Sequence, residues 1–274
     1  MSRPTYDFTG QVAFITGAAR GMGRSHAIAY AEHGADIVAV DICENRPDVP
    51  IELGTRDQLN ETVERVEATG SDALALEADV TDETAVTSAV ERATDRFGRI
   101  DILANNAGIG DFETLCDLPE TRWDAVLDIN LKGVWLPSKH VGTHLAARGD
   151  GGAIISTAST TGLVGQYGMG HYAASKHGVV GLTKSLALEL AEHDVTVNCV
   201  CPTGTDTPGV AATDDVFGDE YITRAEELAG SWNLLDDGML APEDVSDAYL
   251  WLASEASRYV TGIALPVDAG FTAK

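Results

Sequence analysis

The chain has 274 residues, with 18 basic and 43 acidic side chains and a formal net charge of −25. This charge excludes a nucleic-acid binder that neutralises phosphates with Lys and Arg, and it disfavours an anionic membrane surface as a partner. Because 44% of the residues are hydrophobic, the chain can build a core, and its acidity does not indicate disorder.

Apolar runs that predict strands alternate along the chain with amphipathic stretches that predict helices. Asp82 is expected to cap one of these helices. The alternation predicts βαβ units, and so an α/β fold: one doubly wound Rossmann-type domain over residues 1–274, with a parallel seven-stranded sheet and helices on both faces. Strands are predicted at residues 12–16, 36–40, 73–77, 100–104, 153–157, 195–200 and 262–267, and helices at residues 21–33, 55–69, 82–97, 119–148, 172–192 and 242–254.

Two connections are longer than this pattern needs. Residues 42–54 follow the second strand and contain Pro47 and Pro50. Residues 203–240 precede the last helix and carry nine acids against the single base Arg224. Since loops of this length are often lids or binding elements, residues 203–240 are predicted to form a mobile substrate lid.

The acidity and the cysteines bear on the setting of the protein. Asp outnumbers Glu, 25 to 18, and five Lys stand beside thirteen Arg. That pattern resembles proteins adapted to high salt, in which carboxylates keep the surface hydrated; the alternative is an acidic protein from a GC-rich genome. Cys43 and Cys116 are isolated, and Cys199 and Cys201 are expected as buried thiols on one strand. No metal-type spacing, signal peptide or membrane-spanning run is found, so no metal site and a reducing, cytoplasmic location are expected.

A glycine-rich turn joins the first strand to the first helix. The spacing is G-x-x-x-G-x-G, and glycines there allow a tight turn that brings backbone N–H groups to a pyrophosphate at the helix N-terminus. The sequence therefore predicts a dinucleotide site formed by Gly17, Arg20, Gly21, Met22 and Gly23.

Asp41 ends the second strand about twenty residues after the glycine turn, where an acid can accept both ribose hydroxyls of a dinucleotide. A 2′-phosphate beside it would be repelled, so NAD is predicted rather than NADP. Arg20 could instead meet a 2′-phosphate; we expect it to pair with the diphosphate or a neighbouring acid. The alternative for Asp41 is a solvated loop acid.

Tyr172 and Lys176 lie four residues apart on one face of a predicted helix. Tyrosine has an ordinary pKa of about 10. A neighbouring ammonium is expected to lower that pKa toward neutrality and to make the pair a general acid and base for alcohol–carbonyl exchange.

Further motifs surround this pair. Asn105-Asn106-Ala107-Gly108 follows the fourth strand, Ser159 precedes Tyr172 by thirteen residues, and Pro202-Thr203-Gly204-Thr205-Asp206-Thr207 follows the sixth strand. From residue 10 to residue 270 the chain resembles the short-chain dehydrogenase/reductase family. The resemblance implies a catalytic set of Asn130, Ser159, Tyr172 and Lys176, and cofactor contacts from Ile42, Asp79, Val80, Asn106, Ala107, Gly108, Pro202, Thr205 and Thr207. Thr203 departs from the family, which usually has glycine there.

The resemblance also implies roles. Ser159 would donate to the substrate oxygen, Tyr172 would exchange the hydroxyl proton, and Lys176 would bind the nicotinamide ribose. Asn130 would hold a water that links Lys176 to solvent. Asp79 and Val80 would border the adenine, Asn106 would touch the adenosine ribose, and Thr207 would reach the nicotinamide side.

A narrower likeness rests on the long segment after Asp41 and on the ending Leu265-Pro266-Val267-Asp268-Ala269-Gly270. These resemble the carveol-dehydrogenase-like branch, whose members are often linked to mycofactocin and hold NAD tightly. The sequence thus predicts an NAD-dependent oxidoreductase that interconverts a secondary alcohol and a ketone. A sugar 1-dehydrogenase of the same fold and a non-catalytic dinucleotide-binding protein remain alternatives.

Two further expectations concern partners. The chain is expected to form a homotetramer. The helices at 119–148 and 172–192 carry more apolar residues than packing on one sheet face requires, and the family resemblance also implies four subunits. The acidic lid favours a small neutral alcohol or ketone over an anion. Its pocket is expected to be walled by Trp232, Leu234, Leu235, Met239 and Leu240 of the lid and by Leu163, Val164, Tyr167 and Met169 opposite.

Overall fold

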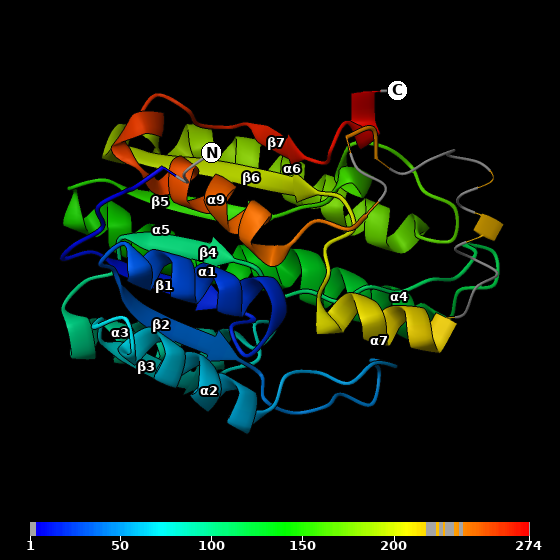
Figure 1. The fold of residues 1–274 in the computed structure, drawn as a ribbon, viewed down its shortest axis with the longest axis horizontal. Helices are drawn as coiled ribbons and strands as arrows, with labels where there is room; N and C mark the ends of the chain where they lie inside the picture. The colour runs from blue at the N-terminus through cyan, green and yellow to red at the C-terminus, as the bar shows by residue number, and fades with distance from the viewer. Residues whose placement is uncertain (1–3, 218–222, 225–226, 228–232, 236–237, 274) are drawn as a thin grey trace.

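All seven strands pair in parallel in one sheet, in the order β3-β2-β1-β4-β5-β6-β7 (Figure 1). The computed structural model describes residues 4–217, 223–224, 227, 233–235 and 238–273. The predicted sheet is confirmed, with small shifts at strand ends. The strands are β1 (Val12–Thr16), β2 (Asp36–Asp41), β3 (Ala73–Glu77), β4 (Ile102–Asn105), β5 (Gly152–Thr157), β6 (Val195–Pro202) and β7 (Ala264–Val267).

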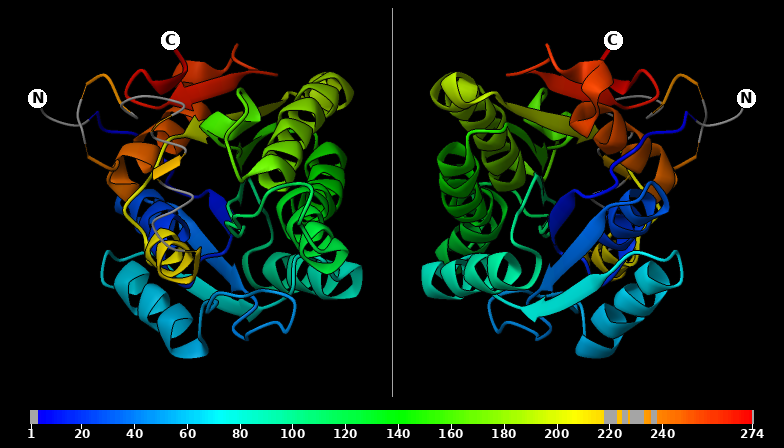
Figure 2. Two further views of the ribbon diagram at one scale, coloured as in Figure 1. Left: turned by 90° about the vertical axis from the view of Figure 1, so that its right-hand side faces the viewer. Right: turned by 90° about the vertical axis from the view of Figure 1, so that its left-hand side faces the viewer.

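Helices cover both faces of the sheet, which makes three layers (Figure 2). One face is covered by α1 (Gly21–Glu32), α2 (Arg56–Glu67) and α9 (Pro242–Ala253), and the other by α3 (Glu83–Phe97), α5 (Gly133–Arg148) and α6 (Gly170–Leu190). Two helices, α4 (Glu120–Leu127) and α7 (Pro208–Phe217), lie beyond the carboxyl ends of the strands (Figure 1). Short turns are η1 (Asp128–Lys132), η2 (Thr160–Gly162), η3 (Ala191–His193), η4 (Glu255–Ser257) and η5 (Phe271–Ala273).

The hydrophobic core lies in two halves, one on each face of the sheet. Alternate residues of β1 feed both: Ala13 and Ile15 pack toward α1 and α9, and Val12 and Phe14 toward α3 and α5. All five residues of β1 are buried, as expected for a central parallel strand with helices on both sides.

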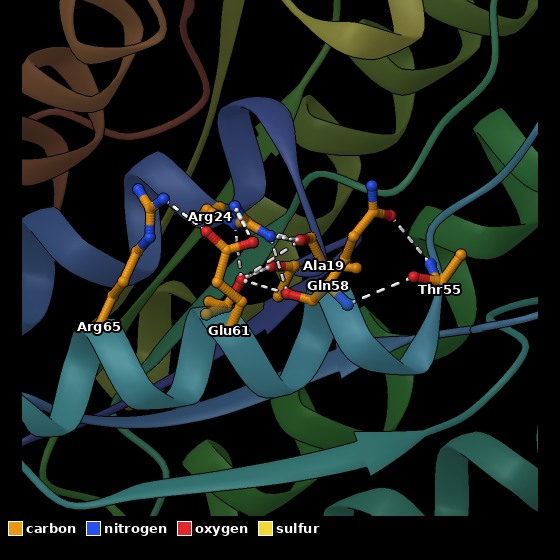
Figure 3. Close-up of polar contacts among 8 residues, drawn as sticks. Ala19, Arg24, Thr55, Gln58, Glu61 and Arg65 are labelled. Atoms are coloured by element: carbon orange, nitrogen blue, oxygen red, sulfur yellow. Dashed lines mark hydrogen bonds and ion pairs between the residues drawn. The ribbon is translucent and has the colours of Figure 1, made fainter.

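Local signals set several helix ends. Asp82 accepts hydrogen bonds from the N–H groups of Thr84 (2.8 Å) and Ala85 (3.3 Å), so the predicted cap of α3 is confirmed. Thr55 caps α2 in a reciprocal capping box with Gln58 (Figure 3).

The single helix predicted over residues 119–148 is wrong in its middle. Between α4 and α5 the backbone widens into one π-helical turn, η1, which contains Asn130. A π-turn is a rare insertion that often accompanies functional sites, and residue periodicity does not reveal it. The Asn130 amide binds two partners: Nδ2 donates to the Ile109 carbonyl and Oδ1 accepts from the Ile109 N–H, both at 2.9 Å, and Nδ2 also donates to Ser175 Oγ at 3.4 Å.

The order of the strands places a site at one edge of the sheet. The chain winds outward from β1 to β3 and then returns to β4, which pairs with the other side of β1. At such a reversal the loops that leave neighbouring strands diverge and open a crevice at the carboxyl edge. In the described part of the chain, no helix is long and apolar enough to cross a membrane.

Candidate active site

A cavity of about 540 Å³ opens at this crevice. It runs from the glycine turn, past the ends of β4 and β5, to the segment that includes Asn233 and Met239. Among the residues predicted for the site, those that line it are Gly17, Arg20, Gly21, Met22, Asp41, Ile42, Asp79, Val80, Asn106, Ala107, Gly108, Ser159, Tyr172, Lys176, Pro202, Thr205 and Thr207. Gly23 and Asn130 are not in the wall.

The three glycine positions of the turn do not readily accept a side chain, because of their backbone conformation or close packing. Gly17 and Gly21 have left-handed φ angles of +66° and +56°. A Cβ on Gly23 would lie 2.0 Å from the Gly17 carbonyl oxygen and 2.7 Å from Asn106 Nδ2. Gly23, which was predicted as part of the dinucleotide site, therefore lies behind the cavity wall, where it lets the first turn of α1 pack against the end of β1.

Both backbone polar groups of Ala19, in this turn, are hydrogen-bonded to side chains. Its N–H donates to Asp41 Oδ2 at 2.9 Å. Its carbonyl accepts from Arg24 at 2.7 Å, and Arg24 also donates to the Gln58 carbonyl and pairs with Glu61 (Figure 3). Arg24, which the sequence analysis did not single out, thus ties the turn to α2.

Asp41 is 8% exposed and lines the cavity, so it is not a solvated loop acid. Burial raises its pKa, while backbone N–H donors and Arg20 act in the opposite direction. Arg20 itself donates to the Glu52 carbonyl, so it contacts the long connection rather than an acid.

The connection at residues 42–54 is anchored along one wall of the cavity. Arg46 pairs with Asp48 at 2.7 Å and with Asp79 at 3.0 Å, while Val49 and Ile51 are buried against Ile109, Val126 and Ile129. A Cβ on Gly54 would lie 2.8 Å from Asp41 Oδ1. Sequence reasoning missed Arg46; the available signal was that it is the lone base in a connection that carries three acids.

Ser159, Tyr172 and Lys176 come together at the other end of the cavity. Ser159 follows β5, and the other two lie in the first two turns of α6. Tyr172 and Ser159 share a hydrogen bond. Lys176 Nζ donates to the Thr157 carbonyl at 2.8 Å and lies 5.5 Å from the centre of the Tyr172 ring.

The predicted lowering of the tyrosine pKa is wrong in direction. Burial raises the pKa of Tyr172 above its ordinary value, and only the hydrogen bond with Ser159 works against this. Burial also lowers the pKa of Lys176 to about 8, which weakens the ammonium as a counter-charge. At neutral pH Tyr172 is therefore a neutral phenol that can donate a proton.

Asn130 stands behind this group. Its amide binds the Ile109 backbone and the Ser175 hydroxyl, and a Cβ on Gly108 would lie 3.1 Å from Asn130 Oδ1 and 3.6 Å from Lys176 Nζ. Gly108 thus keeps a side-chain-free gap between the amide and the ammonium. Asn106 donates to the carbonyls of Thr16 and Gly17, at 3.2 and 3.3 Å, and so holds β4 against the glycine turn.

A buried polar cluster next to Tyr172 was missed by the sequence analysis. Asp111 is 1% exposed; it binds the Arg122 guanidinium with both oxygens and lies 3.0 Å from Nε2 of the buried His171. Burial acts to raise the Asp111 pKa, but the hydrogen bonds from His171 and Arg122 outweigh it and leave that pKa below its ordinary value. The cluster joins the loop after β4 to α4 and to the start of α6. A histidine directly before Tyr172 was the only hint in the sequence.

The predicted substrate walls are only partly correct. Met169 and Met239 line the cavity, but Leu234 and Leu235 are 60% and 87% exposed, and Trp232 lies outside the described residues. Leu163, Val164, Tyr167 and Leu240 do not line it either. The other apolar lining comes from Ile109, Phe112, Ile129 and Val210, and also from Ile51 and Leu53 of the long connection.

Thr203, where the family usually has glycine, gives the cavity rim a side-chain anchor. Its hydroxyl donates to Asn233 Oδ1 at 3.3 Å, and Asn233 Nδ2 donates to the Gly238 carbonyl at 2.7 Å. Of the nine acids in residues 203–240, Asp206 and Glu227 are exposed, and the other seven side chains lie outside the described residues. No cluster of described His, Cys, Asp or Glu residues is arranged to hold a metal ion.

These features fit a dinucleotide. The glycine turn leaves backbone exposed at the start of α1, where partial positive charge and free N–H groups favour a diphosphate. Asp41 offers an acceptor carboxylate beside it, and Ser159, Tyr172 and Lys176 line the same cavity.

Comparison with known proteins also supports a dinucleotide-binding enzyme. A family model described as Enoyl-(Acyl carrier protein) reductase matches residues 17–272. The (-)-trans-carveol dehydrogenase of Rhodococcus erythropolis is 47% identical over 272 residues, covering 97% of this chain and 98% of that protein. Carveol dehydrogenase from Mycobacterium avium, solved in complex with NAD, superposes with a TM-score of 0.91 at 39% identity, over 98% of this chain and 100% of that one.

A short-chain dehydrogenase from Mycobacterium paratuberculosis bound to NAD gives a TM-score of 0.89 at 36% identity, over 98% of this chain and 100% of that one. The chain therefore belongs to the short-chain dehydrogenase/reductase family, and its likeness to carveol dehydrogenases extends over almost the whole length.

The Asp111 cluster gives a stability prediction. Asp111→Asn removes the buried charge that Arg122 and His171 face, and it should lower the unfolding free energy by about 3 kcal/mol in urea titrations at pH 7. Because the folded-state pKa of Asp111 is depressed, its stabilisation is complete above about pH 4 and is lost as the pH falls further, so the two proteins should converge in acid.

Asp124→Asn, a change at an exposed residue of α4, the helix that carries Arg122, is the control and should leave stability nearly unchanged. An equal loss in both variants, or a difference that persists in acid, would contradict the role of the cluster.

Proposed function

We propose that this chain is an NAD-dependent oxidoreductase that interconverts a secondary alcohol and a ketone through Ser159, Tyr172 and Lys176. The observation that carries the proposal is one continuous cavity. A serine–tyrosine–lysine group, in which Ser159 and Lys176 are buried and Tyr172 is partly buried, lies at one end, and a glycine turn beside a buried carboxylate lies at the other. NAD, when bound, would accept a hydride from the carbinol carbon, or as NADH return it to the carbonyl.

The residues of the chain supply the proton chemistry. Ser159 donates a hydrogen bond to the substrate oxygen and holds it beside Tyr172. The Tyr172 hydroxyl gives its proton to that oxygen in reduction and takes it back in oxidation. Lys176 holds positive charge behind the phenol, and Asn130, on the π-turn, would hold a water that relays protons to Lys176.

The remaining cofactor contacts follow from position in the cavity. Gly17, Gly21 and Met22 would face the diphosphate, and Asp41 the adenosine ribose. The adenine would lie by Ile42, Asp79 and Val80, and the rest of the dinucleotide by Ala107, Gly108, Pro202, Thr205 and Thr207. Asn106 supports this wall through the backbone of the glycine turn.

The substrate is proposed to be a neutral secondary alcohol with a hydrophobic, cyclic body. Apolar side chains dominate the cavity beyond Tyr172, and similarity to the (-)-trans-carveol dehydrogenase favours this class. Residues 203–240 would act as its lid, tied to the end of β6 through Thr203 and Asn233. A sugar 1-dehydrogenase is the alternative, and a panel of cyclic terpenols, steroids and pentoses separates the two.

The finer expectations on assembly and location are proposals as well. Trp123 (38% exposed), Trp135 and Leu188 (82% exposed) lie on α4, α5 and α6, and β7 is an edge strand, which supports a homotetramer. All four cysteines are free, with Cys199 and Cys201 buried as predicted, which supports a reducing, cytoplasmic setting. Linkage to mycofactocin and adaptation to high salt stay predictions.

Tyr172→Phe is expected to abolish turnover, by at least about a thousandfold, while NAD binding measured by calorimetry stays close to wild type. A non-catalytic dinucleotide-binding protein would show no turnover to lose. In the wild type, oxidation should accelerate as the pH rises toward the raised pKa of Tyr172, and reduction should slow, because oxidation needs the phenolate and reduction the phenol.

Asp41→Asn keeps an acceptor for the Ala19 N–H and removes only the charge. The ratio of kcat/KM with NAD to kcat/KM with NADP should exceed one in the wild type and fall about 10- to 100-fold in the variant, since a like charge no longer opposes the 2′-phosphate. A wild-type enzyme that prefers NADP would contradict this and would make Arg20 the deciding residue.

The charge of the substrate can be tested directly. A neutral cyclic secondary alcohol should show a kcat/KM at least about tenfold above that of a carboxylated analogue of similar size, in dilute buffer. Molar salt should narrow the gap as charges are screened. Equal or better turnover of the anion in both buffers would refute the proposal.

A further inference from the structure

The Ser159 hydroxyl is constrained by the residue two places after it. Ser159 is the N-cap of η2, and its Oγ accepts a hydrogen bond from the Thr161 N–H at 3.2 Å. The Thr161 hydroxyl donates to the same oxygen at 2.9 Å. A serine hydroxyl has one proton to donate and two lone pairs that accept, so both acceptor positions of Ser159 are filled.

We infer that Thr161 is a positioning residue that makes Ser159 an obligatory hydrogen-bond donor toward the reacting oxygen. With both lone pairs occupied, the remaining O–H bond of Ser159 points away from Thr161, to the side where Tyr172 lies. This inference rests on the proposed alcohol–ketone function and assigns to that site a residue that acts through its two hydrogen bonds to Ser159.

The turn that carries Thr161 cannot shift easily against α6. A Cβ on Gly162 would lie 2.9 Å from the Lys176 carbonyl oxygen and 3.3 Å from Lys176 Cβ, so η2 packs directly on the helix that bears the tyrosine and the lysine. Thr161 is 2% exposed and Ser159 is 9% exposed, so both residues are largely shielded from bulk water although they line the cavity. The donor direction is therefore fixed before substrate arrives.

A one-way donor has two consequences. Ser159 stabilises an oxygen that carries negative charge, whether of Tyr172 or of the substrate, and its hydrogen bond lowers the Tyr172 pKa against the effect of burial. Ser159 cannot accept the hydroxyl proton of an alcohol. That proton is left with Tyr172 as its acceptor, so the substrate hydroxyl is oriented in one way.

The test compares Thr161→Val, which keeps the backbone N–H and shape but removes the hydroxyl, with Thr161→Ser, which restores it. In Thr161→Val, kcat should fall about tenfold with little change in KM, the value expected for one neutral hydrogen bond, and the rise of oxidation rate with pH should move to higher pH. Thr161→Ser should recover both. Thr183→Val, at another threonine that is 2% exposed, controls for loss of a buried hydroxyl.

Two measurements separate positioning from a structural effect. Ser159→Ala should cost roughly a hundredfold or more, and adding Thr161→Val to it should cost almost nothing further, because Thr161 acts through Ser159. The near-ultraviolet tyrosinate signal, taken as the difference from Tyr172→Phe, should show a higher Tyr172 pKa in Thr161→Val than in the wild type or Thr161→Ser. Should Thr161→Val fail to fold in thermal melts, Thr161→Ala replaces it.

The outcomes distinguish this inference from the proposed function. An active wild type whose pH profile and tyrosinate titration are unchanged by Thr161→Val overturns the inference and leaves the function standing, as do additive losses in the double variant. A wild type that turns over no alcohol in the panel, but whose Tyr172 titration shifts only when the Thr161 hydroxyl is lost, overturns the function and leaves the inference standing.

Discussion

The rest of the site depends on the tight backbone contact between Gly17 and Gly23, at the two ends of the glycine turn. Gly23 faces the Gly17 carbonyl at a distance where no Cβ fits, and the Asn106 amide fills the remaining space by binding the carbonyls of Thr16 and Gly17. This contact fixes the direction of α1 and the spacing between the ends of β1 and β4. Gly17 and Asn106 of this contact also line the cavity, so the contact sets one side of the crevice at the strand reversal.

The catalytic end of the cavity depends on a second packed contact, between η2 and α6. Because Gly162 lies against the Lys176 backbone, Ser159 and Tyr172 meet without any flexible element between them. Burial keeps Tyr172 protonated and brings the Lys176 pKa down to about 8. The hydrogen bond with Ser159 lowers the Tyr172 pKa against the effect of burial, and Lys176 Nζ lies 5.5 Å from the centre of the ring.

The long connections are where the chain departs from a minimal fold of its class. Residues 42–54 are anchored at two points of the cavity wall. Arg20 donates to the Glu52 carbonyl, and Arg46 of the segment pairs with Asp79. The segment's apolar residues Val49 and Ile51 pack with Ile129, which lies in the π-turn. This segment therefore links the part of the cavity wall at Asp79 to the π-turn that carries Asn130.

The sequence by itself determined the seven parallel strands of a doubly wound fold, the glycine turn, Asp41 and the tyrosine–lysine pair. These could be found because hydrophobic periodicity and residue spacing are local properties of the chain. The sequence could not give the π-turn at Asn130, since that change leaves the side-chain pattern intact. Nor could it give the Asp111–Arg122–His171 cluster, the anchoring of Arg20, or the sign of the Tyr172 pKa shift. Each of these depends on which groups from distant segments meet in a buried space, and burial and through-space charge exist only once the tertiary structure has formed.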